Sequence, residues 1–261
     1  MLGGLWRYRS FILGMARREF QARYLGSVLG SLWAILNPLT MIFIYTVVFG
    51  QVMRARVPGV DDGLGYGVFL CAGVLTWGMF TEILQRTVNV FLEQANLLKK
   101  MNFPRASLPA IVLLSAVINF AIVFGILLLF LILAGRFPGW ALLGFVPLLA
   151  LQQSLALGLG VALGVMNVFF RDVGHVVGIA LQLWFWFTPI VYPAKVLGER
   201  ARALVALNPM TGLALGYQDI LLRGEWPHWG EYWPQLVLAL AALAFGRVAF
   251  RRFAGEMPDY L

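Results

Sequence analysis

Long apolar stretches recur along this chain of 261 residues and are separated by shorter polar segments. The first runs from residue 29 to residue 50 without a charged side chain and has Asn37-Pro38 near its middle. About 20 consecutive apolar residues are enough to cross a bilayer as a helix. The pattern therefore predicts an all-α integral membrane protein with six transmembrane helices, at 29–50, 65–90, 108–134, 140–170, 173–192 and 232–250.

Two segments outside these spans have patterns of their own. Residues 5–25 place Arg17 and Arg18 on a polar face and apolar side chains on another, which predicts an amphipathic helix at the membrane interface. Residues 193–231 are too long for a simple turn, and we expect a re-entrant helical hairpin there on the outer side. The chain thus divides into an interfacial segment, 1–28, and a six-span membrane domain, 29–261.

Composition and charge support a membrane protein and predict its orientation. The chain is 61% hydrophobic and only 12% charged, whereas soluble domains carry about 25% charged residues. With the N-terminus inside, thirteen basic residues lie on the cytoplasmic side, and the short outer loops hold three, Arg54, Arg56 and Arg136. The positive-inside rule therefore predicts that both termini face the cytoplasm. The basic residues lie at the ends of the apolar spans, so orientation in the membrane, and not nucleic acid binding, explains the net charge of +8.

The chain lacks the sequence signatures of common catalytic and metal sites. It has no Gly-Lys dipeptide and hence no phosphate-binding Walker A loop, and His175 and His228 fall in different predicted compartments. Glu82 and Arg86 lie within a span at a spacing that lets them pair on one helix face. We therefore expect no catalytic residue, metal or cofactor in this chain. Close helix packing explains the small residues of the fourth span, Gly158, Gly160 and Gly164.

The predicted fifth span contains a run of four aromatic residues, 184–187, followed by Thr188-Pro189. A proline at this point kinks a helix and frees a backbone carbonyl. Rings that line a pore would stack on the apolar faces of sugars, whereas the same rings also suit lipid contact or helix packing. Asn37 and Tyr45 of the first span are equally suited to a polar path or to helix association.

The inner loop at about 91–107 is short and basic and carries apolar side chains, reading NLLKKMNFPR from Asn96 to Arg105. A cytoplasmic loop of this kind suits docking into a groove of a soluble partner. It is also one of several motifs that occur in the order typical of one transporter family. The others are RYLGSVLG from Arg23 with Leu36-Asn37-Pro38, FRDV at 170–173, FTPIVYP at 187–193 and LNPM at 207–210.

With these motifs the chain resembles, over essentially its whole length, the polysaccharide-export permeases of ABC transporters. The resemblance implies a homodimeric permease in the bacterial inner (cytoplasmic) membrane, working with two copies of a separate ABC ATPase that binds ATP and Mg. It implies that the substrate is an O-antigen, capsule or teichoic-acid polysaccharide on a lipid carrier. Contact with the ATPase is then assigned to Arg17, Arg18, Asn96, Leu98, Lys99, Lys100, Phe103, Pro104, Arg105, Arg171 and Asp172.

The resemblance also assigns the two ends of the transport path. The hairpin at 193–231 would act as an outer gate, with Tyr192, Pro193, Asn208 and Pro209 as its candidate residues. The first and fifth spans would line the polymer channel, and its candidate residues are Asn37, Tyr45, Trp184, Trp186 and Phe187.

Two other functions are compatible with some of these features but leave others unexplained. A permease of the same superfamily that exports a drug or a lipid has no need of the Phe-Pro-Arg loop or the aromatic fifth span. An integral membrane enzyme acting on lipid-linked sugars would need clustered acids or histidines near an interface. The adjacent acids Asp61 and Asp62 lie instead in a glycine-rich outer loop with no histidine nearby.

Overall fold

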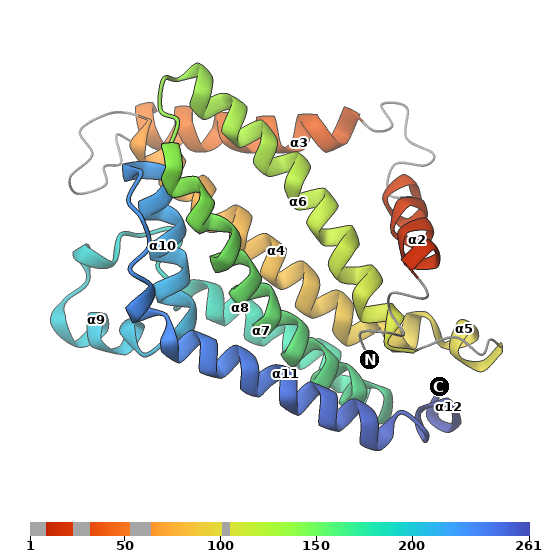
Figure 1. The fold of residues 1–261 in the computed structure, drawn as a ribbon. Helices are drawn as coiled ribbons and strands as arrows, with labels where there is room; N and C mark the ends of the chain where they lie inside the picture. Colours follow the sequence, from red (N-terminus) through yellow and green to blue (C-terminus); the bar gives the residue numbers. More distant parts are fainter. Residues whose placement is uncertain (1–8, 23–31, 53–63, 101–104) are drawn as a thin grey trace.

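The computed structural model describes residues 9–22, 32–52, 64–100 and 105–261, and the regular elements in these ranges are helices. The longest are α4, α6, α7 and α11 (Figure 1), with α7 packed between α4 and α11 and with α6 against α4. The α-helices are α2 (Arg9–Ala22), α3 (Trp33–Phe43), α4 (Gly65–Glu93), α5 (Ala95–Lys100), α6 (Ser107–Leu133), α7 (Leu142–Phe169), α8 (Asp172–Trp186), α9 (Glu199–Ala206), α10 (Pro209–Arg223), α11 (Trp233–Phe253) and α12 (Met257–Tyr260). A π-helix, η2 (Ile44–Val52), continues α3, and short 3-10 turns are η3 (Gly139–Ala141), η4 (Ala194–Val196) and η5 (Trp229–Glu231).

Within the described ranges, four helices are long and apolar enough to cross a bilayer, Gly65–Glu93, Ser107–Leu133, Gly139–Phe169 and Trp233–Phe253. Their bounds agree to within three residues with the predicted second, third, fourth and sixth spans. The predicted first span corresponds to a shorter apolar helix, Ile35–Gly50, and the fifth to α8, which has 15 residues. The fold therefore agrees with a helical membrane protein, while crossings by the first and fifth segments stay predictions.

Helix α8 ends at Trp186, six residues before the predicted end of the fifth span, so that predicted boundary is wrong. Pro189 disfavours helical backbone at the residue before it. The Thr188 N–H accordingly bonds to the Phe185 carbonyl at 3.1 Å in a tighter turn. The Tyr192 hydroxyl then donates to the Trp186 carbonyl at 2.8 Å, which satisfies an acceptor that the helix end leaves free.

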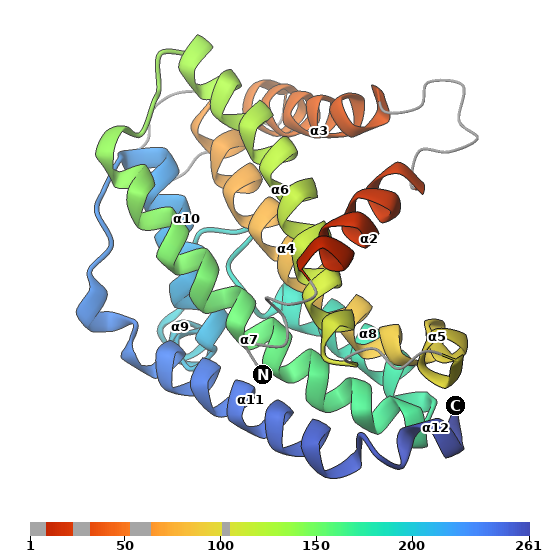
Figure 2. The same cartoon turned by 45° about the vertical axis from the view of Figure 1, so that its right-hand side comes forward.

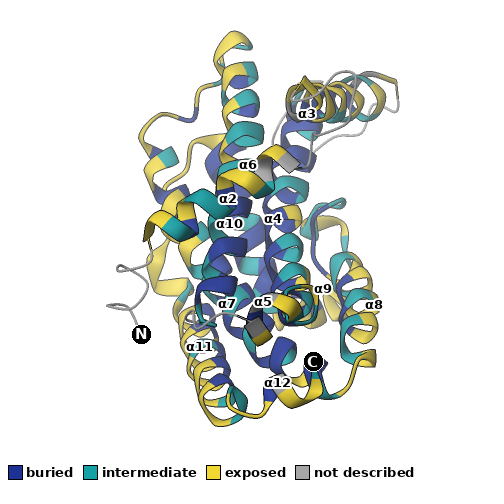
Figure 3. Ribbon diagram, turned by 90° about the vertical axis from the view of Figure 1, so that its right-hand side faces the viewer, coloured by how far each residue is buried: buried dark blue, intermediate teal, exposed yellow. Residues whose placement is uncertain are grey.

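The buried centre of the molecule lies along α4, α7 and α10, whereas α8 and α11 are largely exposed (Figure 3). Tyr217 of α10 is fully buried against Phe145 of α7, with ring centroids 4.8 Å apart. Its hydroxyl donates to Gln152 Oε1 of α7 at 2.8 Å. Helix α10 is too short to cross a bilayer, yet it packs into the core as tightly as the long helices do.

Helices α7 and α11 approach each other backbone to backbone. A Cβ atom placed on Gly158 of α7 would lie 2.5 Å from the Ala242 carbonyl carbon of α11, and one on Gly246 would lie 2.5 Å from the Gly158 oxygen. Gly160 and Gly164 meet Thr87 of α4 on the other side in the same way. Close helix packing, predicted for these glycines, is therefore confirmed.

We call the end of the bundle at which α4, α7 and α11 finish and α6 and α8 begin the basic end. An apolar cluster there joins Ile12 of α2, Phe91 of α4, Leu98 of α5, Phe250 of α11 and Met257 of α12. Figure 2 shows α5 and α12 close together at this end, with α2 lying against α6. The first and last described helices therefore both pack at the basic end.

Candidate functional site

A groove that we call the amphiphilic groove opens between α4 and α8. It has a volume of about 400 Å³, and polar and apolar surface contribute about equally to its lining. Its residues are Trp77, Thr81 and Gln85 of α4 together with Gly178, Leu181, Gln182, Phe185 and Trp186 of α8. Aromatic faces beside amide and hydroxyl groups can stack on a sugar ring and exchange hydrogen bonds with its hydroxyls.

The four consecutive rings of α8 divide between the core and the surface. Trp184 is half-buried and packs edge-on against Trp77 and Phe80, with ring centroids 6.0 Å and 5.5 Å away. Trp186 and Phe187 are 63% and 65% exposed, and Trp186 lines the amphiphilic groove. Trp186 and Phe187 are therefore accessible, whereas Trp184 packs against the core, and the channel role of all three stays a prediction.

The predicted channel residues of the first span lie on other elements. Asn37 of α3 is exposed. Tyr45 of η2 is half-buried, 6.0 Å from Phe49, and both pack on the Phe69–Leu70 pair of α4 together with Val191. The structure thus brings Tyr45 beside the segment that follows α8, but it does not bring it into the amphiphilic groove.

Asn208 is the polar hub at the end opposite the basic end. It caps α10 by accepting from the Met210 N–H at 3.0 Å, and it also accepts from the Trp184 indole N–H at 2.8 Å. Its amide donates to the Phe187 carbonyl at 3.1 Å and to Thr188 Oγ1 at 2.9 Å. One side chain of the predicted outer gate therefore holds the end of α8, and with it the aromatic run, against α10.

The segment predicted to form a re-entrant hairpin contains two short helices, α9 and α10, while its re-entrant placement on the outer side stays a prediction. Leu207 and Asn208 separate the two helices, and Pro209 is the first residue of α10, where a proline costs no hydrogen bond. Tyr192 and Pro193, also predicted for the gate, are half-buried in the segment between α8 and η4. Helix α10 packs on α4 and α7, whereas most of α9 is exposed.

The basic end gathers most of the residues predicted to contact an ATPase. Arg17 and Arg18 are exposed on α2, whose other face buries Ile12 and Ala16, so the predicted amphipathic helix is present. Asn96 and Lys99 are exposed on α5, while Leu98 is buried in the apolar cluster. Arg105 is half-buried just before α6. Phe103, Pro104 and the side chain of Lys100 lie outside the described residues.

Arg171 and Asp172 are exposed in the turn between α7 and α8, also at the basic end. Asn167 fixes this turn: its Oδ1 accepts from the Gly174 N–H at 2.9 Å, and its amide donates to the Val88 carbonyl of α4 at 3.1 Å. Its contacts assign it to helix association.

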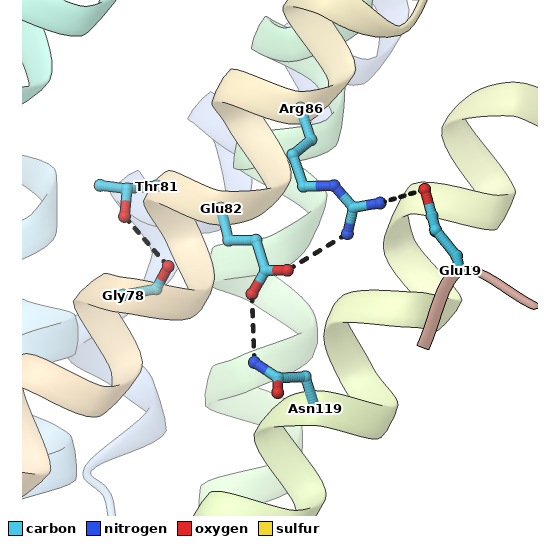
Figure 4. A network of polar contacts seen from close by, with 6 residues as sticks. All are labelled: Glu19, Gly78, Thr81, Glu82, Arg86 and Asn119. Atoms are coloured by element: carbon cyan, nitrogen blue, oxygen red, sulfur yellow. Dashed lines mark hydrogen bonds and ion pairs between the residues drawn. The ribbon is translucent and has the colours of Figure 1, made fainter. Parts of the chain in front are cut away.

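A charged network joins the amphipathic helix to the bundle (Figure 4). Arg86 of α4 pairs with Glu82 one turn earlier, at 3.2 Å, as its spacing predicts, and also with Glu19 of α2 at 2.5 Å. Asn119 of α6 donates to the second Glu82 oxygen at 3.4 Å. Sequence reasoning missed Glu19 and could not name the partner of Asn119, because only the fold brings α2 to Arg86 and α6 to Glu82. The network links α2, α4 and α6 through partly buried charges.

Comparison with known proteins identifies the family to which this chain belongs. A family model described as "ABC-2 type transporter" matches residues 11–222. The O-antigen export system permease protein RfbA of Myxococcus xanthus is 33% identical over 242 residues, which cover 92% of this chain and 89% of that protein. The chain belongs to the ABC-2 type transporter family.

Further relatives carry related names. The O-antigen export system permease protein RfbA of Klebsiella pneumoniae is 28% identical over 80% of this chain and 79% of its own length. The polysialic acid transport protein KpsM of Escherichia coli is 25% identical over 79% of each chain. In this ABC-2 transporter chain, the segment matched by the family model runs from α2 to α10 and includes the amphiphilic groove, Asn208 and the charged network.

Proposed function

We propose that this chain is the permease subunit of an ABC transporter that exports a lipid-linked polysaccharide, of O-antigen, capsule or teichoic-acid type, across the bacterial inner membrane. Its family membership supports a transport subunit, and its relatives are named for O-antigen export and polysialic acid transport. The lining of the amphiphilic groove is the observation from which we infer the substrate class. Exposed Trp186 beside Gln182 and Gln85 suits a chain of sugars better than it suits a purely apolar drug or lipid.

The proposal that this chain is an ABC transporter permease also implies its partners. Two copies of the permease would form the channel, and two copies of a separate ABC ATPase would bind at the basic end and hold ATP and Mg. The exposed Arg17, Arg18, Lys99 and Arg171 offer that partner a positive surface. This chain itself would bind no cofactor and catalyse no reaction.

Transport requires that movement at the basic end reach the substrate path. Glu19 and Arg86 join the amphipathic helix to α4, which forms one wall of the amphiphilic groove. Asn208 joins the other wall, α8, to the hairpin of α9 and α10. A partner that binds the two states of the permease differently would then shift both walls and the outer gate together. Weak contacts along the groove would let the polymer advance without being trapped.

The first experiment deletes this gene in its host and measures polysaccharide on the cell surface and lipid-linked glycan inside the cell. We expect loss from the surface with accumulation inside. Loss from both places would contradict export and would favour an enzyme of polymer synthesis. Unchanged polysaccharide with altered resistance to an apolar compound would favour a drug or lipid exporter.

The groove assignment is tested by complementing this deletion with Trp186→Ala. Aromatic contacts of this kind are worth about 0.5–1.5 kcal/mol, so we expect the export rate to fall about two- to tenfold at equal protein level. Trp233→Ala is the matched control, because Trp233 is similarly exposed, at 66%, but lies on α11 outside the groove. Equal export by both variants would place Trp186 on a lipid-facing surface.

A further inference from the structure

A second groove, which we call the apolar groove, lies where α6, α7 and α11 meet near the basic end. It has a volume of about 420 Å³ and an almost wholly apolar lining. Ala110 and Leu113 of α6, Val161 of α7 and Phe250 of α11 form much of its wall. Arg247 of α11 is the one charged residue among those that line it. It shares no element with the amphiphilic groove.

Small residues create much of this hollow, because they leave space between the helices unfilled. Gly158 and Gly246 bring the backbones of α7 and α11 into direct contact at its floor. Ala106 and Ala110 present only methyl groups from the α6 side. The hollow is therefore built from the helix packing itself, within the volume range of about 300–1,000 Å³ that is common for small-molecule sites.

Arg247 stands at this groove with no counter-ion among the residues that the structure describes. Its side chain is exposed, and no residue of the described ranges lies within hydrogen-bond or ion-pair distance of its guanidinium. It precedes the last residue of α11, Phe253, by six positions, or about 9 Å along a helix. A guanidinium at this depth can extend toward the membrane surface, where it meets phosphate groups. The planar guanidinium also matches phosphate oxygens in pairs.

We propose that the apolar groove binds an anionic glycerophospholipid from the leaflet at the basic end, with an acyl chain in the groove and the phosphate on Arg247. The groove residues extend over eight positions from Ala106, the N-cap of α6, to Leu113, and over eight positions of α11, from Leu243 to Phe250. Each run corresponds to about 10 Å of helix, which falls within one leaflet of a hydrocarbon core about 30 Å thick.

Charge argues for this lipid over a second copy of the chain. A two-fold interface on this face would bring each subunit the same surface, including the same Arg247, and so would place like charges in an apolar contact. An anionic headgroup instead neutralises the arginine while its acyl chain covers the lining. The proposal needs only that the chain is embedded in a membrane, and it is independent of what the transporter exports.

The test uses the full-length permease purified with its bound lipid and offered phosphatidylglycerol or phosphatidylcholine, with native mass spectrometry counting the lipid retained per protomer. We expect about tenfold preference for phosphatidylglycerol, because only that headgroup carries a net negative charge for the guanidinium. Arg247→Gln should abolish the preference. Arg252→Gln is the matched control, since Arg252 lies over the Phe253 ring, 5.7 Å from its centre, and does not line the groove.

A second variant, Ala110→Phe, fills the apolar groove and keeps the charge of Arg247. Ala110→Phe should lower retention of both lipids, whereas Arg247→Lys should keep part of the preference, so the proposal stays testable if Arg247→Gln folds poorly. Unchanged preference in Arg247→Gln, or loss of preference in Arg252→Gln as well, would overturn it. Stronger retention of an isoprenyl phosphate than of phosphatidylglycerol would also overturn it, because the site would then belong to a lipid carrier.

Discussion

The two grooves have nearly equal volumes, about 400 Å³ for the amphiphilic groove and about 420 Å³ for the apolar groove, yet they offer opposite surfaces. The first combines rings with amide and hydroxyl groups, and the second combines apolar groups with one arginine. Volume therefore says little about what either groove binds. The chemistry of the lining assigns the first to sugars and the second to an anionic lipid.

The grooves also differ in how their walls are held. The apolar groove depends on backbone contact between α7 and α11, which leaves no space to adjust. The amphiphilic groove depends on a hydrogen bond that Asn208 donates at one end of α8 and on one that Asn167 accepts at the other. Hydrogen bonds can exchange partners, whereas a packed backbone contact cannot. We expect the movable parts of the transporter to lie on the side of α8, with α7 and α11 as the fixed frame.

The largest effect is expected from breaking the frame with Gly158→Leu. Even a Cβ at this position would lie 2.5 Å from backbone atoms of Ala242 and Leu243, so α7 and α11 would have to separate. Overpacking costs about 1–3 kcal/mol and more when backbone must move. We expect the yield of monodisperse protein to collapse in size-exclusion chromatography. Gly125→Leu is the control, because no atom lies within 4 Å of a Cβ placed there. Equal yields would contradict a rigid frame.

A smaller loss is expected from Asn208→Ala, which loosens the wall of the amphiphilic groove. The change removes the cap of α10 and the acceptor of the Trp184 indole N–H. Loss of a helix cap alone costs about 0.5–2 kcal/mol, and each kcal/mol lowers the melting temperature of a chain this size by about 2–4 °C.

Asn208→Asp separates the two roles of this side chain. Its carboxylate still accepts from Met210 and Trp184 but no longer donates to Phe187 and Thr188. We expect it to keep most of the thermal stability and to impair export. A melting temperature as low as that of Asn208→Ala would show that the donated bonds, and not the cap, hold α8.

The smallest effect on stability is expected when the amphiphilic groove is made apolar with Gln182→Leu. Gln182 is exposed and lines the groove, and surface substitutions usually change stability by no more than about 0.5 kcal/mol. Export should nevertheless fall, because a sugar hydroxyl would lose its polar partner. Ser154→Ala is a control on α7, since the Ser154 hydroxyl donates only to its own helix at Ala150. Unchanged export by Gln182→Leu would remove the chemical distinction between the grooves.

Hydropathy alone located most of the elements of this protein. The four long apolar helices begin and end within three residues of their predicted bounds, because a long and mainly apolar segment satisfies its backbone hydrogen bonds in a bilayer by forming a helix. The two short helices on either side of Leu207 and Asn208 and the amphipathic helix also followed from local pattern, while a re-entrant placement of the two short helices stays a prediction. The ordered motifs predicted the family, which the comparisons confirm.

Only the tertiary structure decided which faces of these helices meet. In a membrane helix, protein-facing and lipid-facing positions are equally apolar, so periodicity does not separate them. The sequence therefore could not tell that Trp184 turns inward to Trp77 and Asn208 while Trp186 faces outward. It could not assign Glu19 to Arg86, since 67 positions separate them along the chain. Both grooves exist because distant helices meet, and no local pattern encodes that meeting.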